Sequence, residues 1–269
     1  MNRKSAIEKN IAEMTPGEFR VLARRNEWSA VTGDACPGYA QANLVIVPKA
    51  FAFEFLLFCN RNPGPCPVIE VTNPGEYRSR FTAPEADLRT DLPRYRVFKS
   101  GRIIDEPLDI IKYWDENLVA FLLGCSWNFD SGLRAANVQY RYIGDHSTNI
   151  ECVSAGSFHG TMVVTTRAFK SSHDAVRAIQ ITSRNPAAHG PPVNIGNPED
   201  IGIKDIYHPD MFSSHEHIKS IGPNEIIMSW ACGITPQTVA LTSKIPFLIS
   251  HYPGHMFVTD KLSEELTVL

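Results

Sequence analysis

The chain has 269 residues, of which 43% are hydrophobic and 20% charged, and its formal net charge at pH 7 is −3. This balance is typical of a globular protein and lacks the basic excess with which proteins bind nucleic acid or anionic membranes. A chain of this length buries about three quarters of the surface that it exposes when unfolded, as one large domain or two unequal ones.

The first residues, MNRKSAIEKN, do not predict export, because they contain no apolar core and Glu8 interrupts them. The most apolar run, residues 50–58, contains Glu54 and is too short to span a bilayer. None of the six cysteines sits in a C-x-x-C pair, so we expect neither a disulfide framework nor a zinc knuckle. We therefore expect a cytoplasmic protein with reduced thiols and no membrane partner.

The first predicted helix begins at Thr15-Pro16-Gly17-Glu18. Thr15 can cap it, Pro16 suits the first helical position, and Glu18 completes a capping box. Residues 44–47 then predict a buried strand, and residues 49–60 predict the helix that follows it.

The order of strand, tight turn and helix recurs twice. Residues 118–123 predict a strand before a helical stretch that ends at residue 136, and residues 226–230 predict a strand before a helix capped at Thr235-Pro236. With a fourth strand at residues 247–250, this alternation predicts an α/β fold with a mainly parallel sheet and helices on both faces. Ligands bind such sheets at the carboxyl ends of the strands. That rule selects Cys125, Ser126, Cys232, Gly233, Thr235 and His251.

The centre of the chain has a different pattern. Residues 138–143 and 160–167 predict antiparallel strands, and residues 172–184 predict one helix. A turn-rich tract with many prolines follows at residues 185–224, and a structureless loop of that length argues for an insertion with short elements of its own. We therefore expect a discontinuous α/β domain, residues 1–137 and 225–269, with a smaller α+β unit inserted at residues 138–224.

A dense group of charges lies at residues 86–97, ADLRTDLPRYRV, which we call the charged turn. Arg89 and Arg94 have the side chains to hold a carboxylate in two-point contact. Asp91, with Asp87 as the alternative, can pair with an ammonium group and serve as a base. The charged turn thus predicts a clamp for a small zwitterion or dicarboxylate. The alternative is that these charges neutralise one another in a folded loop.

Three histidines are candidates for a general acid. His189 precedes Gly190-Pro191-Pro192, and His251 and His255 bracket a Pro-Gly turn, so each ring can be held in place and act near neutral pH. The alternative for each is a histidine that bonds loop carbonyls. His251 and His255 have the spacing of helical metal ligands, but the Pro-Gly pair between them breaks that helix, so we predict no metal site.

The cysteines provide a competing chemistry. Cys232 or Cys125, at the start of a helix, would have a lowered pKa and could act as a nucleophile. The alternative is that both are small apolar fillers at tight junctions between strand and helix. The sequence contains no phosphate loop and no dinucleotide fingerprint, so we expect no cofactor.

Five stretches together carry a family resemblance. They are PGYAQANLVIVP (37–48), FCNRNPGPCPVIEV (58–71), DLRTDLPRYRVF (87–98), ITSRNPAAHGPPVNIGNPEDIGI (181–203), and WACGITPQ with HYPGHMFVTD (230–237 and 251–260). Over nearly its whole length the chain resembles the D-glutamate cyclase family, also described as hydro-lyases. The resemblance implies a two-part α/β architecture with a smaller inserted unit. It also implies cyclisation of D-glutamate to 5-oxo-D-proline with loss of water.

The sequence therefore supports three alternative functions. The first is a cofactor-independent lyase that acts on a small amino dicarboxylate. In it the charged turn binds substrate, and backbone N–H groups at Cys232-Gly233 or Cys125-Ser126 form an oxyanion hole. The second is a thiol-dependent amidohydrolase-like enzyme that uses Cys232 or Cys125, and the third is a non-catalytic protein that binds a carboxylate metabolite. In each case the expected partner is a small carboxylate and not a nucleic acid, and a homodimer is left open.

Overall fold

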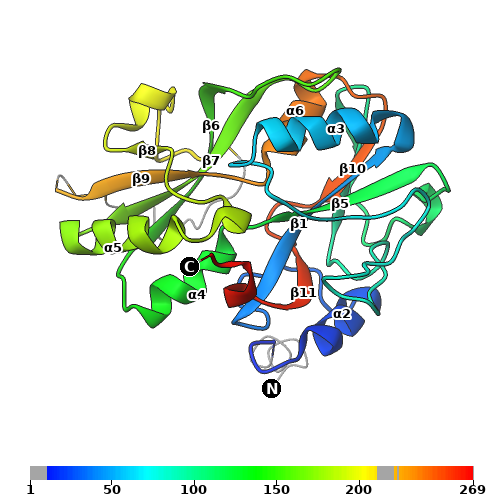
Figure 1. The fold of residues 1–269 in the computed structure, drawn as a ribbon, viewed down its shortest axis with the longest axis horizontal. Helices are drawn as coiled ribbons and strands as arrows, with labels where there is room; N and C mark the ends of the chain where they lie inside the picture. Colours follow the sequence, from blue (N-terminus) through cyan, green and yellow to red (C-terminus); the bar gives the residue numbers. More distant parts are fainter. Residues whose placement is uncertain (1–10, 211–220, 223, 269) are drawn as a thin grey trace.

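The computed structural model describes residues 11–210, 221–222 and 224–268, and the segment MNRKSAIEKN lies outside these ranges. The described chain forms two β-sheets that lie side by side, with helices packed against them (Figure 1). No helix in these ranges is long and apolar enough to cross a membrane.

The larger sheet has seven strands in the order β2-β5-β1-β10-β3-β4, with β11 also paired to β1. Its strands are β1 (Tyr39–Pro48), β2 (Val68–Val71), β3 (Tyr95–Lys99), β4 (Arg102–Asp105), β5 (Leu118–Gly124), β10 (Leu248–His251) and β11 (Phe257–Leu262). The second sheet has the order β6-β7-β9-β8. Its strands are β6 (Arg141–Glu151), β7 (Thr161–Phe169), β8 (Asn194–Ile195) and β9 (Ile226–Ala231).

The prediction of a mainly parallel sheet with helices on both faces is wrong. Every pairing between the described strands is antiparallel. The strand predicted at residues 226–230 forms as β9, but it pairs with β7 and β8 in the second sheet. The predicted division of the chain at residues 138 and 225 is not tested by these pairings and stays a prediction.

The error has a physical cause in the connections. Helix α4 (Trp127–Ala135) leads from β5 in the larger sheet to β6 in the second, and α6 (Thr235–Thr242) leads from β9 back to β10. A helix that joins two different sheets imposes no parallel pairing, unlike a crossover within one sheet. Within the larger sheet, β1 and β2 do run in the same direction, but β5 lies between them and pairs antiparallel with both.

The remaining described α-helices are α2 (Pro16–Arg24), α3 (Lys49–Arg61) and α5 (Ser172–Thr182). Short 3₁₀ turns occupy Ile111–Tyr113, Pro186–Ala188, Pro198–Ile201 and Ser263–Leu266. The predicted capping box of α2 is confirmed, with Thr15 and Glu18 bonded to each other's backbone N–H groups. The cap predicted for α6 is wrong by one residue, because Ile234 occupies the N-cap and Thr235 is already helical.

Three apolar clusters hold these elements together. On one face of the larger sheet, α3 packs on β1 and β5, with the ring of Phe55 4.8 Å from that of Phe121. The other face is covered by the segment around Leu88 and Leu92. On the second sheet, α4 and α5 pack over Trp230 of β9. The ends of β5 and β9 thus meet at the boundary between the two sheets.

Candidate functional site

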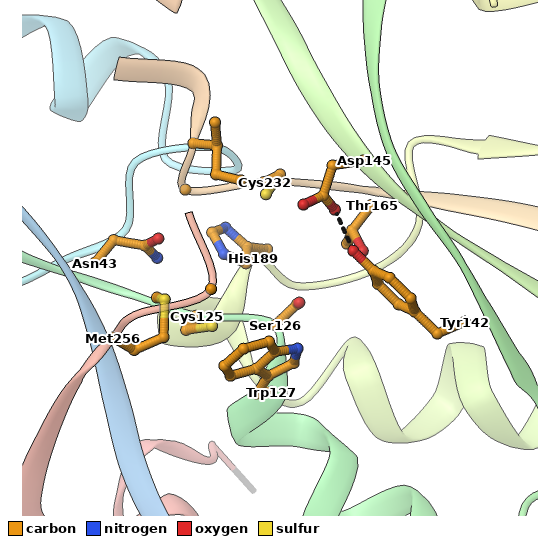
Figure 2. A pocket seen from close by; sticks show the side chains of 13 residues that line it. Asn43, Cys125, Ser126, Trp127, Tyr142, Asp145, Thr165, His189, Cys232 and Met256 are labelled. Atoms are coloured by element: carbon orange, nitrogen blue, oxygen red, sulfur yellow. Dashed lines mark hydrogen bonds between the residues drawn. The ribbon is translucent and has the colours of Figure 1, made fainter. Parts of the chain in front are cut away.

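A buried cavity lies where the two sheets meet (Figure 2). Its volume is about 30 Å³, which is room for about one water molecule. A ligand of amino-acid size must therefore displace some of the lining side chains on entry. The lining residues are Asn43, Cys125, Ser126, Trp127, Tyr142, Asp145, Thr165, His189, Cys232, Gly233, Ile234, Gly254 and Met256.

The two strand-to-helix junctions are held together by Asn43 of β1. Its side-chain amide donates a hydrogen bond of 2.5 Å to the carbonyl of Gly124 at the end of β5. The same amide lies against Gly233 after β9, where an added Cβ atom would come within 2.1 Å of Nδ2. Glycine at position 233 is therefore required for the junctions to approach each other this closely.

Asp145 on β6 is the carboxyl group of the cavity. The residue is 4% exposed, and its Oδ1 accepts a hydrogen bond of 2.8 Å from the hydroxyl of Tyr142, drawn as a dashed line in Figure 2. Burial raises the pKa of Asp145 from 3.8 to about 6, and the hydroxyls of Tyr142 and Thr165 only partly oppose this shift. A carboxyl group with such a pKa can both take up and release a proton near neutral pH.

His189 faces the same cavity as a neutral ring. Its Nδ1 lies 2.7 Å from the carbonyl oxygen of Gly64. Because a carbonyl only accepts, Nδ1 carries the proton, and Nε2 is left with a lone pair as an acceptor. Burial lowers the pKa of His189 from 6.5 to about 4. The ring is thus fixed as a hydrogen-bond acceptor, which differs from the general acid predicted from the sequence.

The two cysteines of the cavity are thiols and not thiolates. Burial raises the pKa of Cys125 to about 12 and that of Cys232 well above its usual range. A lowered pKa is what activates a nucleophilic cysteine. The environment of these residues therefore argues against the thiol-dependent alternative.

Of the residues predicted from the sequence, the structure brings five together at the cavity. They are Cys125, Ser126, His189, Cys232 and Gly233. Thr235 lies just beyond, and its hydroxyl donates to the Cys232 carbonyl at 2.7 Å. The Cys232 N–H donates to Val163 at 2.9 Å, so it is not available as an oxyanion donor.

The remaining predicted residues do not line the cavity. His251 is buried with its Nδ1 3.2 Å from the backbone nitrogen of Leu44, and burial lowers its pKa to about 4. Asp91 is fully buried and receives two hydrogen bonds of 2.7 Å from Arg24 of α2. These bonds make Asp91 an anchor between α2 and the charged turn.

The arginines of the charged turn have different surroundings. Arg89 forms a two-point ion pair with Asp87, with contacts of 2.7 and 2.9 Å, and stacks on Tyr77. Arg94 lies 5.5 Å from the ring of Tyr252, and among the described residues its buried Nε has no hydrogen-bond partner. The pair of Arg89 and Asp87 thus matches the alternative in which charges of the turn neutralise one another.

The sequence reasoning missed Asp145, Tyr142 and Thr165. Tyr142 and Thr165 lie within the strands predicted at residues 138–143 and 160–167, whereas Asp145 lies on the part of β6 beyond the first of them. A signal was present, since RYIGDHST places an aspartate at a position where a strand turns its side chain inward. In the described part of the chain, no three His, Cys, Asp or Glu side chains gather in a group that could hold a metal ion.

The cavity between the two antiparallel sheets is a candidate small-molecule site, because a few polar side chains converge on it and one of them, Asp145, has a raised pKa. A family model described as D-glutamate cyclase matches residues 119–260. The chain belongs to this family.

Relatives named "Putative hydro-lyase" resemble the chain over nearly its full length. The one from Geobacillus kaustophilus is 48% identical over 264 residues, which are 96% of this chain and 98% of the relative. A relative from Bacillus licheniformis is 47% identical, covering 97% of this chain and 100% of its own, and YcsI of Bacillus subtilis is 45% identical, covering 95% and 100%. A nitrogen repressor-like protein of Methanococcus jannaschii has a TM-score of only 0.39 at 8% identity, which supports no argument about fold.

Proposed function

We propose that the chain is a hydro-lyase that closes D-glutamate, or a related small amino dicarboxylate, to 5-oxo-D-proline or its analogue, with release of water. Membership of the D-glutamate cyclase family supports this reaction. The observation that carries the assignment of the site is the buried carboxyl group of Asp145, whose pKa of about 6 suits proton transfer at neutral pH.

The reaction requires no net proton from the protein. The substrate amine attacks the distal carboxyl carbon, so a C–N bond forms and a C–O bond breaks. The ammonium nitrogen loses two protons, and the departing oxygen leaves with two as water. One group that takes a proton from nitrogen and returns it to oxygen can therefore serve both steps, and proximity is largely supplied by the substrate itself.

Asp145 is the residue that we assign to this transfer. As a carboxylate it accepts a proton from the substrate nitrogen, and as a carboxylic acid it gives the proton to the departing oxygen. Tyr142 fixes the position of its Oδ1. The acceptor Nε2 of His189 suits an N–H group of the substrate, and it orients the amine toward the carbon that it attacks.

The backbone at the cavity can stabilise the tetrahedral intermediate. The oxygen of that intermediate carries a negative charge, and the N-terminus of a helix favours such a charge. Gly233 lies at the start of α6 and lines the cavity. Its N–H group is the donor that we assign to this role.

A ¹H NMR assay of the purified chain with D-glutamate, L-glutamate and 5-oxoproline tests the proposal. We expect the signals of 5-oxoproline to appear with D-glutamate. Turnover should fall by about 10²–10⁴-fold in Asp145→Asn. The matched control is Asp115→Asn, because Asp115 is exposed and its Oδ1 accepts a hydrogen bond that asparagine preserves.

The same assay separates the alternatives. If the wild type binds D-glutamate in a thermal-shift measurement but yields no product, the chain is a carboxylate-binding protein and the proposal fails. If Asp145→Asn turns over like the wild type, a different group moves the proton.

A further inference from the structure

A fully buried arginine, Arg167 of β7, lies directly behind the cavity. Its side chain is 0% exposed. Four aromatic rings surround the guanidinium carbon at 4.9–5.9 Å: Phe129, Tyr140, Tyr142 and Trp230. A charge removed this completely from water costs free energy unless other groups compensate it.

The compensation within the protein is incomplete. Nη2 of Arg167 lies 3.2 Å from Oδ1 of Asp130. A guanidinium group has five N–H donors, and among the described residues neither Nε nor Nη1 of Arg167 has a hydrogen-bond partner. The guanidinium charge also partly opposes the rise in the pKa of Asp145 that burial causes. Arg167 therefore places a positive charge next to the cavity.

Ser126 connects this arginine to the cavity. Its Oγ lies 3.5 Å from Nη2 of Arg167, and since arginine only donates, the serine oxygen is the acceptor. Ser126 is the N-cap residue of α4, yet its side chain makes no capping hydrogen bond. Its hydroxyl proton is thus available to a ligand, and Figure 2 shows the hydroxyl pointing into the cavity.

We propose that Ser126, with Arg167 behind it, forms the subsite for the substrate carboxylate that does not react. The inference rests on the proposed function for the identity of the ligand. The serine hydroxyl donates to the carboxylate, the guanidinium polarises that hydroxyl and supplies the positive charge, and the start of α4 adds its dipole. Ser126 contacts the substrate, whereas Arg167 is a positioning residue that acts through it.

The chemistry of ring closure decides which carboxylate this is. The distal carboxyl group must accept the attack and lose an oxygen, so it belongs beside the proton-transfer group Asp145. The other carboxylate stays ionised throughout, and its negative charge is best held near a fixed positive charge. Ser126 and Arg167 provide that charge in place of the arginines of the charged turn.

The test uses glutarate, a dicarboxylate that has no amine and cannot cyclise, so binding is measured without turnover. Isothermal titration calorimetry compares the wild type with Ser126→Ala and with Ser131→Ala. Ser131 lies on the same helix, outside the cavity, and its hydroxyl donates to the carbonyl of Asn128. We expect glutarate to bind about 10–100-fold more weakly to Ser126→Ala, and equally well to Ser131→Ala.

Kinetics with D-glutamate give a second readout. In Ser126→Ala, KM should rise by the same factor as the glutarate Kd, while kcat changes by less than about threefold, because the subsite binds ground and transition states alike. Arg167→Lys alone should weaken glutarate binding relative to the wild type. The double variant Ser126→Ala/Arg167→Lys should bind glutarate about as weakly as Ser126→Ala alone, because Arg167 acts through Ser126. If Arg167→Lys weakened binding only by disturbing the fold, its effect on the glutarate Kd would add to that of Ser126→Ala.

The outcomes are distinct. An unchanged glutarate Kd in Ser126→Ala, or no glutarate binding to the wild type, overturns the subsite even where D-glutamate is turned over. Weaker binding to Ser126→Ala supports the subsite even where no turnover is found, and then the proposed reaction alone fails.

Discussion

The charged turn and the cavity differ in how their charged groups are paired. In the charged turn, Arg89 is bound to Asp87, and Asp91 is bound to Arg24 from α2. In the cavity, Asp145 accepts a hydrogen bond from the hydroxyl of Tyr142 and has no direct ion pair, and its pKa rises to about 6. The ion pairs give Asp87 and Asp91 a structural role, whereas the raised pKa of Asp145 lets it exchange a proton near neutral pH.

The comparison shows that a high density of charged residues along a sequence does not by itself mark a reactive site. Oppositely charged residues that are close in sequence can satisfy one another, so a dense group is first of all a folded loop. A reactive group needs the opposite condition, in which the fold removes it from water without pairing it directly with a counter-charge. That condition arises between residues distant in sequence, as for Asp145 on β6 and His189 in the loop after α5.

The largest expected effect is on turnover, and a pair of matched substitutions, one in the cavity and one in the charged turn, tests it. Asp145→Asn should lower kcat/KM by about 10²–10⁴-fold. Asp91→Asn should leave turnover per folded molecule unchanged, but lower the free energy of unfolding by about 1–3 kcal/mol, because two hydrogen bonds from Arg24 are disrupted. NMR turnover and urea denaturation measure the two quantities. If folded Asp91→Asn has no activity, the charged turn is catalytic and the comparison is wrong.

The second prediction concerns stability and pH. The native pKa of Asp145, about 6, exceeds the ordinary value of 3.8, so the native state binds more proton than the unfolded state between these values. The stabilising contribution of Asp145 is therefore present below pH 3.8 and is lost as pH rises through 6. Relative to the wild type, Asp145→Asn should gain roughly 2–3 kcal/mol of unfolding free energy between pH 4 and pH 8.

Urea denaturation of both proteins at the two pH values measures this difference. The lowered pKa values of His189 and His251 make stability rise with pH between about 4 and 6.5, but both proteins share that contribution and it cancels. A difference between Asp145→Asn and the wild type that is the same at both pH values would mean that Asp145 is not desolvated.

Local elements were predictable because their signals are local. The capping box at Thr15 and the strands at residues 44–47 and 118–123 lie where their patterns place them. The sheet topology was not predictable from alternation, because a helix between two strands does not reveal whether those strands share a sheet. The connection through α4 crosses from one sheet to the other, and only tertiary packing decides this.

In the candidate site, too, the residues with a local sequence signal were predicted and those that depend on tertiary packing were not. Cys125 and Cys232 were found because they follow predicted strands, and the ends of β5 and β9 do meet at the cavity. The rule used to select them assumes a parallel sheet, which does not form. Asp145 was missed because it lies beyond the strand predicted at residues 138–143, and its unusual environment comes from β7 and the two junctions.

A smaller effect is expected from the cysteines of the cavity. Burial keeps both as thiols, with the pKa of Cys125 raised to about 12. Cys125→Ser and Cys232→Ser should each retain turnover within about tenfold of the wild type, because serine preserves size and hydrogen bonding. A thiol-dependent mechanism predicts a loss of several orders of magnitude instead. NMR turnover of the two variants decides between them.

The smallest effect is expected at Arg89, where the sequence alone predicted a substrate clamp. Lysine keeps the charge of Arg89 but cannot make its two-point contact with Asp87, nor stack as a planar group on Tyr77. The pair is partly exposed, so Arg89→Lys should lower the free energy of unfolding by at most about 1 kcal/mol. The KM for D-glutamate should stay within about twofold of the wild type, since Arg89 does not line the cavity. A large rise in KM in Arg89→Lys, with stability unchanged, would mean that the charged turn binds the substrate carboxylate. Ser126 and Arg167 would then have only a structural role.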